Sequence, residues 1–479
     1  MVKTFVVDLF CGAGGTTISI KEAETNIEVV VCINHDETSI KSHTLNNKNC
    51  IHKIEDIRTV AMQPLVDLIN KLRIDNSGCK IALWASLECT NFSNAKSGPK
   101  NADSRTLAEH LFRYLKALDP DFLWIENVKE FKDWGPLDEN GNPIKSRKGE
   151  NYKKWIKKLT SEFFDKEWSE QILMSADYGG ATIRERLFLQ FAKDSRMIGV
   201  PTQTHSKYKN DGLMDWVPIR TCLDFSNKGR SIFNRKKKLV SKTHKRFVKG
   251  FLKHGHEVNC SFGIKYYGQI GTQDIEQPSG ALTCKDRIYP VFSTPVMIKQ
   301  NFGTSNCRSL NVPSSAITAV PKNDLVFVHN PQYGGSSRSV NQPSATLIAR
   351  QDKAPLATVT GVSSADLMRI SPITERYAND SDITELEDGT YVINIFFCDD
   401  LWMRYIKRYM YCNQLCDVTF RSLEIEEMLA IQGFPEGYQL AGTKTEQKKQ
   451  VGNSVEVEVG KALISSIDHN IQKYSLCQK

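Results

Sequence analysis

The feature that most constrains the fold is an alternation, through residues 1–195, of short apolar runs with helix-like stretches. The runs predicted to form strands are residues 5–10, 28–33, 81–85 and 122–125. Between the last two, one helical face is formed by Leu107, Leu111, Tyr114, Leu115 and Leu118. Because strands that alternate with helices pair in parallel, this part is predicted to be an α/β domain with a doubly wound sheet.

The alternation stops after residue 195, and helical periodicity returns at Leu423. Residues 196–416 are richer in Gly, Pro, Ser, Thr and short strand-like runs, which favours a mostly β domain. In residues 417–479, an apolar stripe suited to packing on a sheet is formed by Val455, Val459, Ala462, Leu463 and Ile467. We therefore expect one α/β domain built from both ends of the chain, with a second domain inserted.

An internal repeat marks the inserted segment. Residues 277–283 recur as 312–318 and again as 342–348, and the copies share a Pro-Ser pair. Each copy follows an aromatic–Gly pair and precedes a polar stretch that contains Lys and Asp. Two interpretations remain open: a repeated turn and strand of architectural value only, or three polar tips on one surface that touches substrate.

Composition limits the class of protein. No run of 18 apolar residues occurs and the first residues lack the features of a signal peptide, so we expect a cytoplasmic protein without a membrane partner. The 13 cysteines are scattered without paired spacing, which favours a reducing compartment and gives no sign of a metal site. Cys412 and Cys416 come nearest to a paired spacing, and one helical turn between them explains it. The net charge of +8 permits an anionic partner.

A glycine-rich turn, residues 8–15, follows the first predicted strand. Glycines there allow positive φ and a close approach of the backbone to a ligand. The second strand ends at Asn34 and His35, where such folds place a ribose-binding side chain, and Asp56 and Ile57 follow a third possible strand, where an adenine would be held. Together these features predict an adenosine-bearing cofactor, while the absence of a Gly-Lys-Ser/Thr signature disfavours ATP.

A candidate nucleophile, Cys89, comes just after the strand at 81–85, on the sheet edge where open α/β sheets bind ligands. Taken alone, it would equally be an inert buried cysteine. Glu126, however, ends the next strand at the same edge, and a thiolate beside a carboxylic acid suits attack on an electron-poor ring. Cys89 would add to carbon 6 of a pyrimidine, protonated Glu126 at ring nitrogen 3 would absorb the developing charge, and carbon 5 would then attack a methyl group.

These motifs resemble the DNA cytosine-5 methyltransferase family over residues 1–195 and about 417–473, with a divergent middle. Six motifs stand in the family's order, at residues 8–15, 89–93, 126–128, 177–188, 421–435 and 452–455. The resemblance implies a Rossmann-like methyltransferase sheet, S-adenosyl-L-methionine as cofactor and double-stranded DNA as partner. It also implies that residues 196–416 hold the target-recognition domain, and that the target cytosine leaves the base stack to reach Cys89.

The resemblance also implies a set of site residues. The catalytic residues are Cys89, Glu126, Arg184 and Arg186. Arg186 is expected at the exocyclic oxygen of the cytosine, whereas Arg184 is expected to support the loop or Glu126. The residues implied to bind the cofactor are Phe10, Gly12, Ala13, Gly14, Gly15, Asn34, His35, Asp56, Ile57, Asn453, Ser454 and Val455.

Three departures from the family pattern affect details. Glu88 and Thr90 flank the nucleophile where the family has Pro and Gln, Thr182 stands in place of a Gln, and Asn34 in place of a ribose-binding acid. A carboxylate beside Cys89 disfavours the thiolate. Glu88 therefore points away, pairs with Lys96, or accepts a hydrogen bond from the cytosine amino group, and we favour the last.

Residues 228–253 contain eleven Lys or Arg and no Asp or Glu. A solvated face is the usual explanation of such a run, but in a protein suspected of handling DNA a phosphate contact is favoured. Part of the stretch is predicted to pack, through the interleaved Ile232, Phe233, Phe247, Phe251 and Leu252.

Two other functions are compatible with parts of the sequence. One keeps the fold and takes RNA as substrate, as in the tRNA-acting branch of the family, but that branch has a short recognition region. The other is a non-catalytic DNA-binding relative, against which Cys89, Glu126 and Arg186 argue. The family suggests a monomer that marks bacterial or phage DNA in restriction-modification, with a DNA recognition sequence that the chain does not reveal.

Overall fold

The computed structural model describes residues 1–87, 107–208, 212–254 except 228 and 234, short segments within 262–359, and 368–476 except 378, 388–389 and 413–414. Nearly all of the three repeat copies, and the nucleophile segment with Cys89, therefore lie outside the described residues.

The chain divides into two compact units. The first consists of Met1–Asp224, Ile275–Arg287 and Leu423–Lys479, and the second of Phe225–Asp274 and Ile288–Ser422. Both ends of the chain thus contribute to the first unit. The domain boundaries expected from the sequence differ from these limits and stay predictions.

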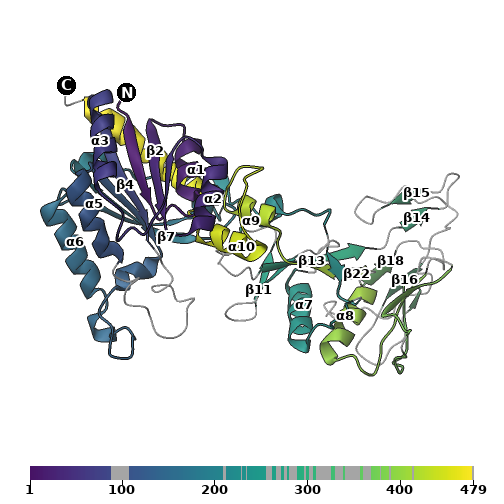
Figure 1. Cartoon of the computed structure of the whole chain (residues 1–479). Helices are drawn as coiled ribbons and strands as arrows, with labels where there is room; N and C mark the ends of the chain where they lie inside the picture. Colours follow the sequence, from purple (N-terminus) through teal and green to yellow (C-terminus); the bar gives the residue numbers. More distant parts are fainter. Residues whose placement is uncertain are drawn as a thin grey trace, which may run out of the picture. The chain divides into compact units, whose positions relative to one another are not determined.

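A seven-stranded sheet with the order β3-β2-β1-β4-β5-β7-β6 forms the centre of the first unit (Figure 1). Its strands are β1 (Thr4–Leu9), β2 (Ile27–Asn34), β3 (Ile51–Ile54), β4 (Lys80–Ser86), β5 (Phe122–Asn127), β6 (Ser169–Met174) and β7 (Glu185–Ala192). Neighbours from β3 to β5 pair in parallel, whereas β7 is antiparallel to β5 and β6. The predicted α/β class and the doubly wound sheet are confirmed, and the four predicted strands are β1, β2, β4 and β5.

Helices cover both faces of this sheet. The helices described in the first unit are α1 (Gly15–Glu22), α2 (Glu37–Asn46), α3 (Gln63–Asp75), α5 (Leu111–Leu118), α6 (Glu150–Glu162), α9 (Ile425–Ile431), α10 (Lys444–Asn453) and α11 (Val457–Leu476). One core lies between the sheet and α3, α5 and α6, and it includes all five residues of the predicted helical face at 107–118. The other core lies between the sheet and α11, through Val459, Leu463 and Ile467. Figure 1 shows α11, in yellow, beside the purple N-terminal strands.

The strand order fixes where a ligand site forms. From β1 the chain continues outward through β2 and β3, and it then returns to build β4 and β5 on the other side of β1. In open α/β sheets, the crevice at such a reversal, outside the carboxyl ends of the strands, is where ligands bind. The turn after β1 and the end of β5 both lie on that edge.

The second unit is mainly β among its described residues. Its largest sheet has the order β10-β22-β13-β11-β12. The strands of this unit are β10 (Arg230–Ser231), β11 (Phe262–Lys265), β12 (Gly271–Asp274), β13 (Ile288–Pro295), β14 (Ile298–Gln300), β15 (Asn306–Arg308), β16 (Leu325–Val328), β17 (Arg338–Ser339), β18 (Leu356–Val359), β19 (Arg369–Ile370), β20 (Ile383–Glu385), β21 (Tyr391–Ile393) and β22 (Leu415–Phe420). Two helices, α7 (Ser241–His254) and α8 (Leu401–Cys412), share a core with β22.

The basic stretch, residues 228–253, includes α7. The apolar residues interleaved in the stretch differ in how deeply they are buried. Ile232, Phe247 and Phe251 are buried in the core of the second unit, Phe233 packs against that core, and Leu252 is exposed. The prediction that part of this stretch packs is therefore correct for four of the five apolar residues. No helix in the described part of the chain is long and apolar enough to span a membrane.

Candidate functional site

The turn after β1 has an unusual backbone. Phe10 adopts φ 64°, and Gly12 and Gly14 adopt φ 54° and 107°. A positive φ is easy for glycine but strained for a bulky aromatic residue, and such strain concentrates at ligand sites. The amides of Phe10 and Cys11 both donate to the carbonyl of Ile33, at 2.9 and 3.3 Å, which fixes the turn against β2. The Tyr438 hydroxyl donates to the carbonyl of Ala13.

The C-terminal motif lies directly against this turn. A Cβ atom added at Gly15 would lie 2.5 Å from the carbonyl oxygen of Val455 and 3.2 Å from Cβ of Ser454. Glycine is therefore required at position 15 by the close approach of the two segments. Ser454 and Val455 are buried, whereas Asn453 is exposed. The structure thus brings together the two groups of expected cofactor residues that lie farthest apart in the sequence.

The end of β2 carries the next expected residues. Asn34 is half-buried, and its Oδ1 accepts a hydrogen bond from the amide of Asp36 at 2.9 Å. His35 is exposed. Asp36 caps α2 by accepting hydrogen bonds from the amides of Thr38 and Ser39. The short side chain at position 34 therefore takes part in the loop that begins α2.

Asp56 and Ile57 follow the carboxyl end of β3, just as Asn34 and His35 lie at the carboxyl end of β2. The guanidinium of Arg58 donates hydrogen bonds to both carboxylate oxygens of Asp56, and this pairing lowers the pKa of the Asp56 carboxyl to about 2. The Ile57 side chain is buried in the core, and its carbonyl accepts from the Tyr114 hydroxyl at 2.8 Å. Asp56 is thus an anion at neutral pH, whereas Ile57 is held mainly by the core.

A buried acid and an arginine meet at the end of β5. Glu126 is 6% exposed, and its Oε1 lies 3.0 Å from Nε of Arg186. The β5–β7 register pairs Glu126 with Phe188, so Arg186, two residues earlier, is on the same face of β7. Burial raises the pKa of the Glu126 carboxyl, and the positive charges of Arg186 and Arg184 oppose the rise. Glu126 is therefore protonated more readily than an exposed glutamate.

Arg184 has a different environment from Arg186. Its side chain is 2% exposed and donates hydrogen bonds to the carbonyls of Gly452 and Ser454, at 3.1 and 2.9 Å. The neighbouring Ile183 donates its amide to the carbonyl of Ser279, in the first repeat copy. Arg184 thus ties the segment before β7 to the C-terminal motif, and Arg186 forms an ion pair with Glu126.

Cys89, Glu88, Thr90 and Lys96 lie outside the described residues. The described chain before them ends at Leu87, whose carbonyl accepts a hydrogen bond from Nδ2 of Asn127 at 3.4 Å. The last described residue of the β4 end is therefore next to the residue that follows Glu126. The nucleophile role of Cys89, and the three explanations of Glu88, stay predictions.

Two features near the site gave no signal in the sequence. Glu456, next to Val455, is fully buried, and burial raises the pKa of its carboxyl to about 8. Cys11, Cys32 and His43 meet beneath the glycine-rich turn. Neither feature follows from local spacing, because each depends on contacts between segments that are distant in the chain.

The fold and this site define a Rossmann-like α/β protein with a reversal of strand order between β1 and β4. The family model described as C-5 cytosine-specific DNA methylase matches residues 4–469. The chain therefore belongs to the C-5 cytosine-specific DNA methylase family.

Individual relatives are distant. Type II methyltransferase M.Sau3AI of Staphylococcus aureus is 24% identical over 240 residues, which is 48% of this chain and 53% of the relative. Type II methylase M.HgiDII of Herpetosiphon aurantiacus is 24% identical over 210 residues, or 43% of this chain and 51% of the relative. The alignments thus span about half the length of these relatives. The crystal structure of a Spodoptera frugiperda DNMT2 mutant is 14% identical with a TM-score of 0.49, over 97% of this chain and 99% of that chain.

Proposed function

We propose that this protein is a cytoplasmic, monomeric enzyme that transfers a methyl group from S-adenosyl-L-methionine to carbon 5 of a cytosine in double-stranded DNA. The observation that carries the proposal is the buried Glu126–Arg186 pair, on the same sheet edge as the strained turn at Phe10. Two relatives are named type II methylases, which supports a role in restriction-modification.

The residues around the glycine-rich turn fit the cofactor. The turn from Phe10 to Gly15 contains three residues with positive φ, and Ser454 and Val455 pack directly against Gly15. Asn34 offers an amide to a ribose hydroxyl, and Asp56 offers a carboxylate oxygen to the adenine amino group. When bound, the cofactor supplies an electrophilic methyl group. The chain's own task is to hold it over the base and to exclude water.

Residues of the protein activate the cytosine for methyl transfer. The Cys89 thiolate adds to carbon 6 of the flipped cytosine, while the Glu126 carboxyl donates a proton to ring nitrogen 3. This turns carbon 5 into a nucleophile, which takes the methyl group. Carbon 5 then loses its proton to a water molecule, the bond from sulfur to carbon 6 breaks to release the Cys89 thiolate, and nitrogen 3 returns its proton to Glu126. The raised pKa of Glu126 supports its role as the proton donor.

Replacing Arg186 is expected to lower activity, whereas replacing Arg184 is expected to lower stability. Arg186→Ala should lower kcat/KM by about 10²–10³-fold with folding intact, because a charged donor at the base is lost. Arg184→Ala should lower the free energy of unfolding by about 3 kcal/mol, because its buried hydrogen bonds to the carbonyls of Gly452 and Ser454 are lost. Single-turnover kinetics and urea unfolding of both variants separate the effects. A stable but inactive Arg184→Ala beside a harmless Arg186→Ala would show that the roles are reversed.

The basic stretch is proposed to contact DNA phosphates. Lys236, Lys237, Lys238 and Lys242 are exposed, whereas Arg235 bonds to backbone carbonyls and Lys245 rests on the ring of Trp402. Changing the four exposed lysines to Gln should weaken binding to all DNA sequences alike. The slope of log K against log salt should become shallower by up to about 3–4, since each phosphate contact contributes about 0.9. Fluorescence anisotropy over a salt series measures this.

The matched control removes the same charge elsewhere. Lys71, Lys153, Lys157 and Lys166 are exposed on the first unit, so their fourfold change to Gln alters the net charge equally. This control should leave the salt slope at the parental value. Loss of the preferred site alone in the first variant would mean that the stretch reads bases.

One experiment tests the proposed function as a whole. The protein is incubated with S-adenosyl-L-methionine that carries a labelled methyl group, together with double-stranded DNA or tRNA, and the modified base is mapped. Label on carbon 5 of DNA cytosine supports the proposal. Label on tRNA alone, or on neither substrate, contradicts it.

A further inference from the structure

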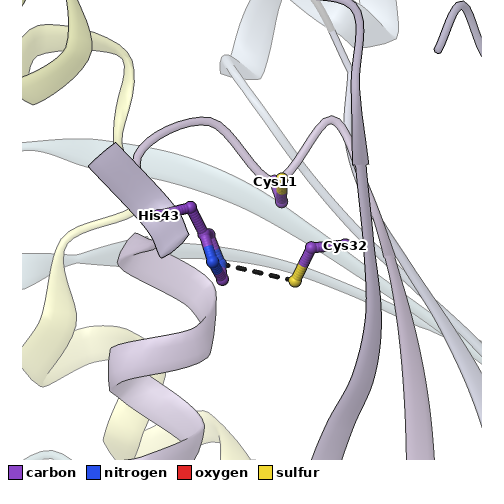
Figure 2. Close-up of side chains that lie close together, drawn as sticks. All are labelled: Cys11, Cys32 and His43. Carbon is purple, nitrogen blue, oxygen red and sulfur yellow. Dashed lines mark hydrogen bonds between the residues drawn. The ribbon is translucent and has the colours of Figure 1, made fainter. Parts of the chain in front are cut away.

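Three side chains that are distant in the sequence meet beneath the glycine-rich turn (Figure 2). Cys11 belongs to the turn, Cys32 to β2 and His43 to α2, and all three are buried. Sγ of Cys32 lies 3.4 Å from Nε2 of His43, and the three ligand atoms all lie within 4.8 Å of one another. Figure 2 shows His43 facing Cys32 across the gap between helix and strand.

Cys50 adjoins this group, and with His43 and His52 it forms a second group whose ligand atoms also lie within 4.8 Å of one another. It precedes β3, is half-buried, and its Sγ lies 3.7 Å from Sγ of Cys32. Zinc binds sulfur at about 2.3 Å and imidazole nitrogen at about 2.0 Å, so a tetrahedral site separates two sulfurs by roughly 3.8 Å and sulfur from nitrogen by roughly 3.5 Å. The Cys32–Cys50 and Cys32–His43 separations therefore match two edges of such a site.

The second nitrogen of His43 also has a partner. Nδ1 of His43 lies 2.8 Å from Nε2 of His52. A histidine that binds a metal through one ring nitrogen characteristically donates the N–H of the other to an acceptor, which fixes the ring. With His52 as that acceptor, Nε2 of His43 is the atom left to bind a metal. Before a metal enters, that nitrogen is also 3.0 Å from the Thr17 hydroxyl.

A buried carboxyl adds an independent observation. Asp8 is fully buried at the end of β1, and neither of its carboxylate oxygens has a hydrogen-bond partner. Burial raises the pKa of the Asp8 carboxyl well above its usual range. A buried polar group without a partner is costly. A divalent cation among these thiols would favour the ionised form of this carboxyl group, whose oxygens otherwise have no partner.

We propose that Cys11, Cys32 and His43 bind a structural zinc ion beneath the glycine-rich turn, and that Cys50, which contacts Cys32, completes the ligand set when the metal binds. Thiolates with imidazole select zinc among the common divalent ions, and a closed set of three cysteines and one histidine is a structural type of site. On binding, each thiol gives up its proton to solvent. No metal site was expected from the sequence, because these residues are spread over positions 11–50 without a short Cys-x-x-Cys spacing.

The consequence is a link between the metal and the turn. A Cβ atom added at Gly14 would lie 3.1 Å from Cδ2 of His43, so the imidazole packs directly on the turn. Cys11 is itself part of the turn. Zinc that holds both residues stabilises the conformation in which Phe10 and Gly14 have positive φ. The proposal does not depend on the methyl-transfer function, since metal content and stability are measured without substrate.

The test uses the full chain, purified with a reductant and without chelator. Elemental analysis should find about one zinc per chain. After removal of zinc and addition of cobalt(II), a thiolate-to-cobalt charge-transfer band with an intensity appropriate for three sulfurs should appear. Chelator should lower the melting temperature, and zinc should restore it.

Variants assign the ligands. Cys32→Ser and His43→Ala should lower zinc affinity by at least about 100-fold, and Cys50→Ser should reduce the charge-transfer band. The matched control is Cys79→Ser, a half-buried free cysteine outside the cluster, which should keep full zinc content. Because a variant can fail to fold, the cobalt spectrum of the parental protein is the decisive measurement.

Three outcomes would overturn the proposal. The first is a folded, reduced parental protein that binds neither zinc nor cobalt. The second is a cobalt spectrum without the charge-transfer band. The third is a disulfide between Cys32 and Cys50 in protein that has never held metal, which would mean that the cluster is a redox pair.

Discussion

Replacing Cys89 by Ser is expected to lower methyl transfer by about 10⁴-fold or more, the scale seen when an essential nucleophile is removed. A serine hydroxyl is not ionised at neutral pH and has no base assigned to it in the proposed mechanism, so carbon 6 of the cytosine is not attacked. Affinity for S-adenosyl-L-methionine should stay near the parental value. The proposed cofactor residues lie in other segments, from Phe10 to Gly15 and from Asn453 to Val455.

Turnover with labelled cofactor and calorimetric cofactor binding measure the two quantities in parallel. A companion assay uses DNA that contains 5-fluorocytosine, because fluorine does not leave carbon 5 as a proton does. The parental protein should accumulate a covalent adduct at Cys89, and Cys89→Ser should form none. Cys222→Ser, a change at another free cysteine, serves as the control and should behave like the parent. Appreciable turnover by Cys89→Ser would exclude covalent catalysis at this residue.

Glu126→Gln is expected to lower the single-turnover rate of transfer by about 10²–10⁴-fold, the range that a positioned acid contributes. The amide preserves the shape of the side chain but has no proton to give to ring nitrogen 3. Cofactor binding and the melting temperature should change little. Glu126→Asp, which keeps the acid but shortens the side chain, should retain more activity than Glu126→Gln.

The pH dependence gives a second readout of Glu126. Burial raises the pKa of this carboxyl, so its protonated fraction at a given pH exceeds that of an exposed glutamate. Because the proposed step needs the protonated form, the rate should fall as pH rises through the raised pKa. Glu126→Gln should lack that decline. A variant that transfers methyl groups at the parental rate, with the same pH profile, would remove Glu126 from the mechanism.

Much of the first unit could be predicted because its signals are local. The strands β1, β2, β4 and β5 are continuous apolar runs, as expected for strands buried on both faces of a parallel sheet. The helical face at residues 107–118 follows from a spacing of three and four residues. The second unit was harder, because its many short strands carry weak patterns.

The site was predictable as a set of residues but not as an arrangement. The positions of Glu126, Arg184 and Arg186 followed from motif order. Their partners did not, since the ion pair of Arg186 depends on the β5–β7 register, and the hydrogen bonds of Arg184 depend on a segment 268 and 270 residues away. The sequence therefore indicated the chemistry, and the structure distinguished the environments of the two arginines.

By itself, the sequence determined the α/β class, the glycine-rich turn and the family, because apolar periodicity, glycine's freedom at positive φ and motif order are properties of the chain in one dimension. Only the tertiary structure decided that Val455 packs on Gly15 and that Cys11, Cys32 and His43 converge. The physical reason is that β2 pairs with β1 while α2 packs beside them. Side chains with no regular spacing are thus carried to one buried point.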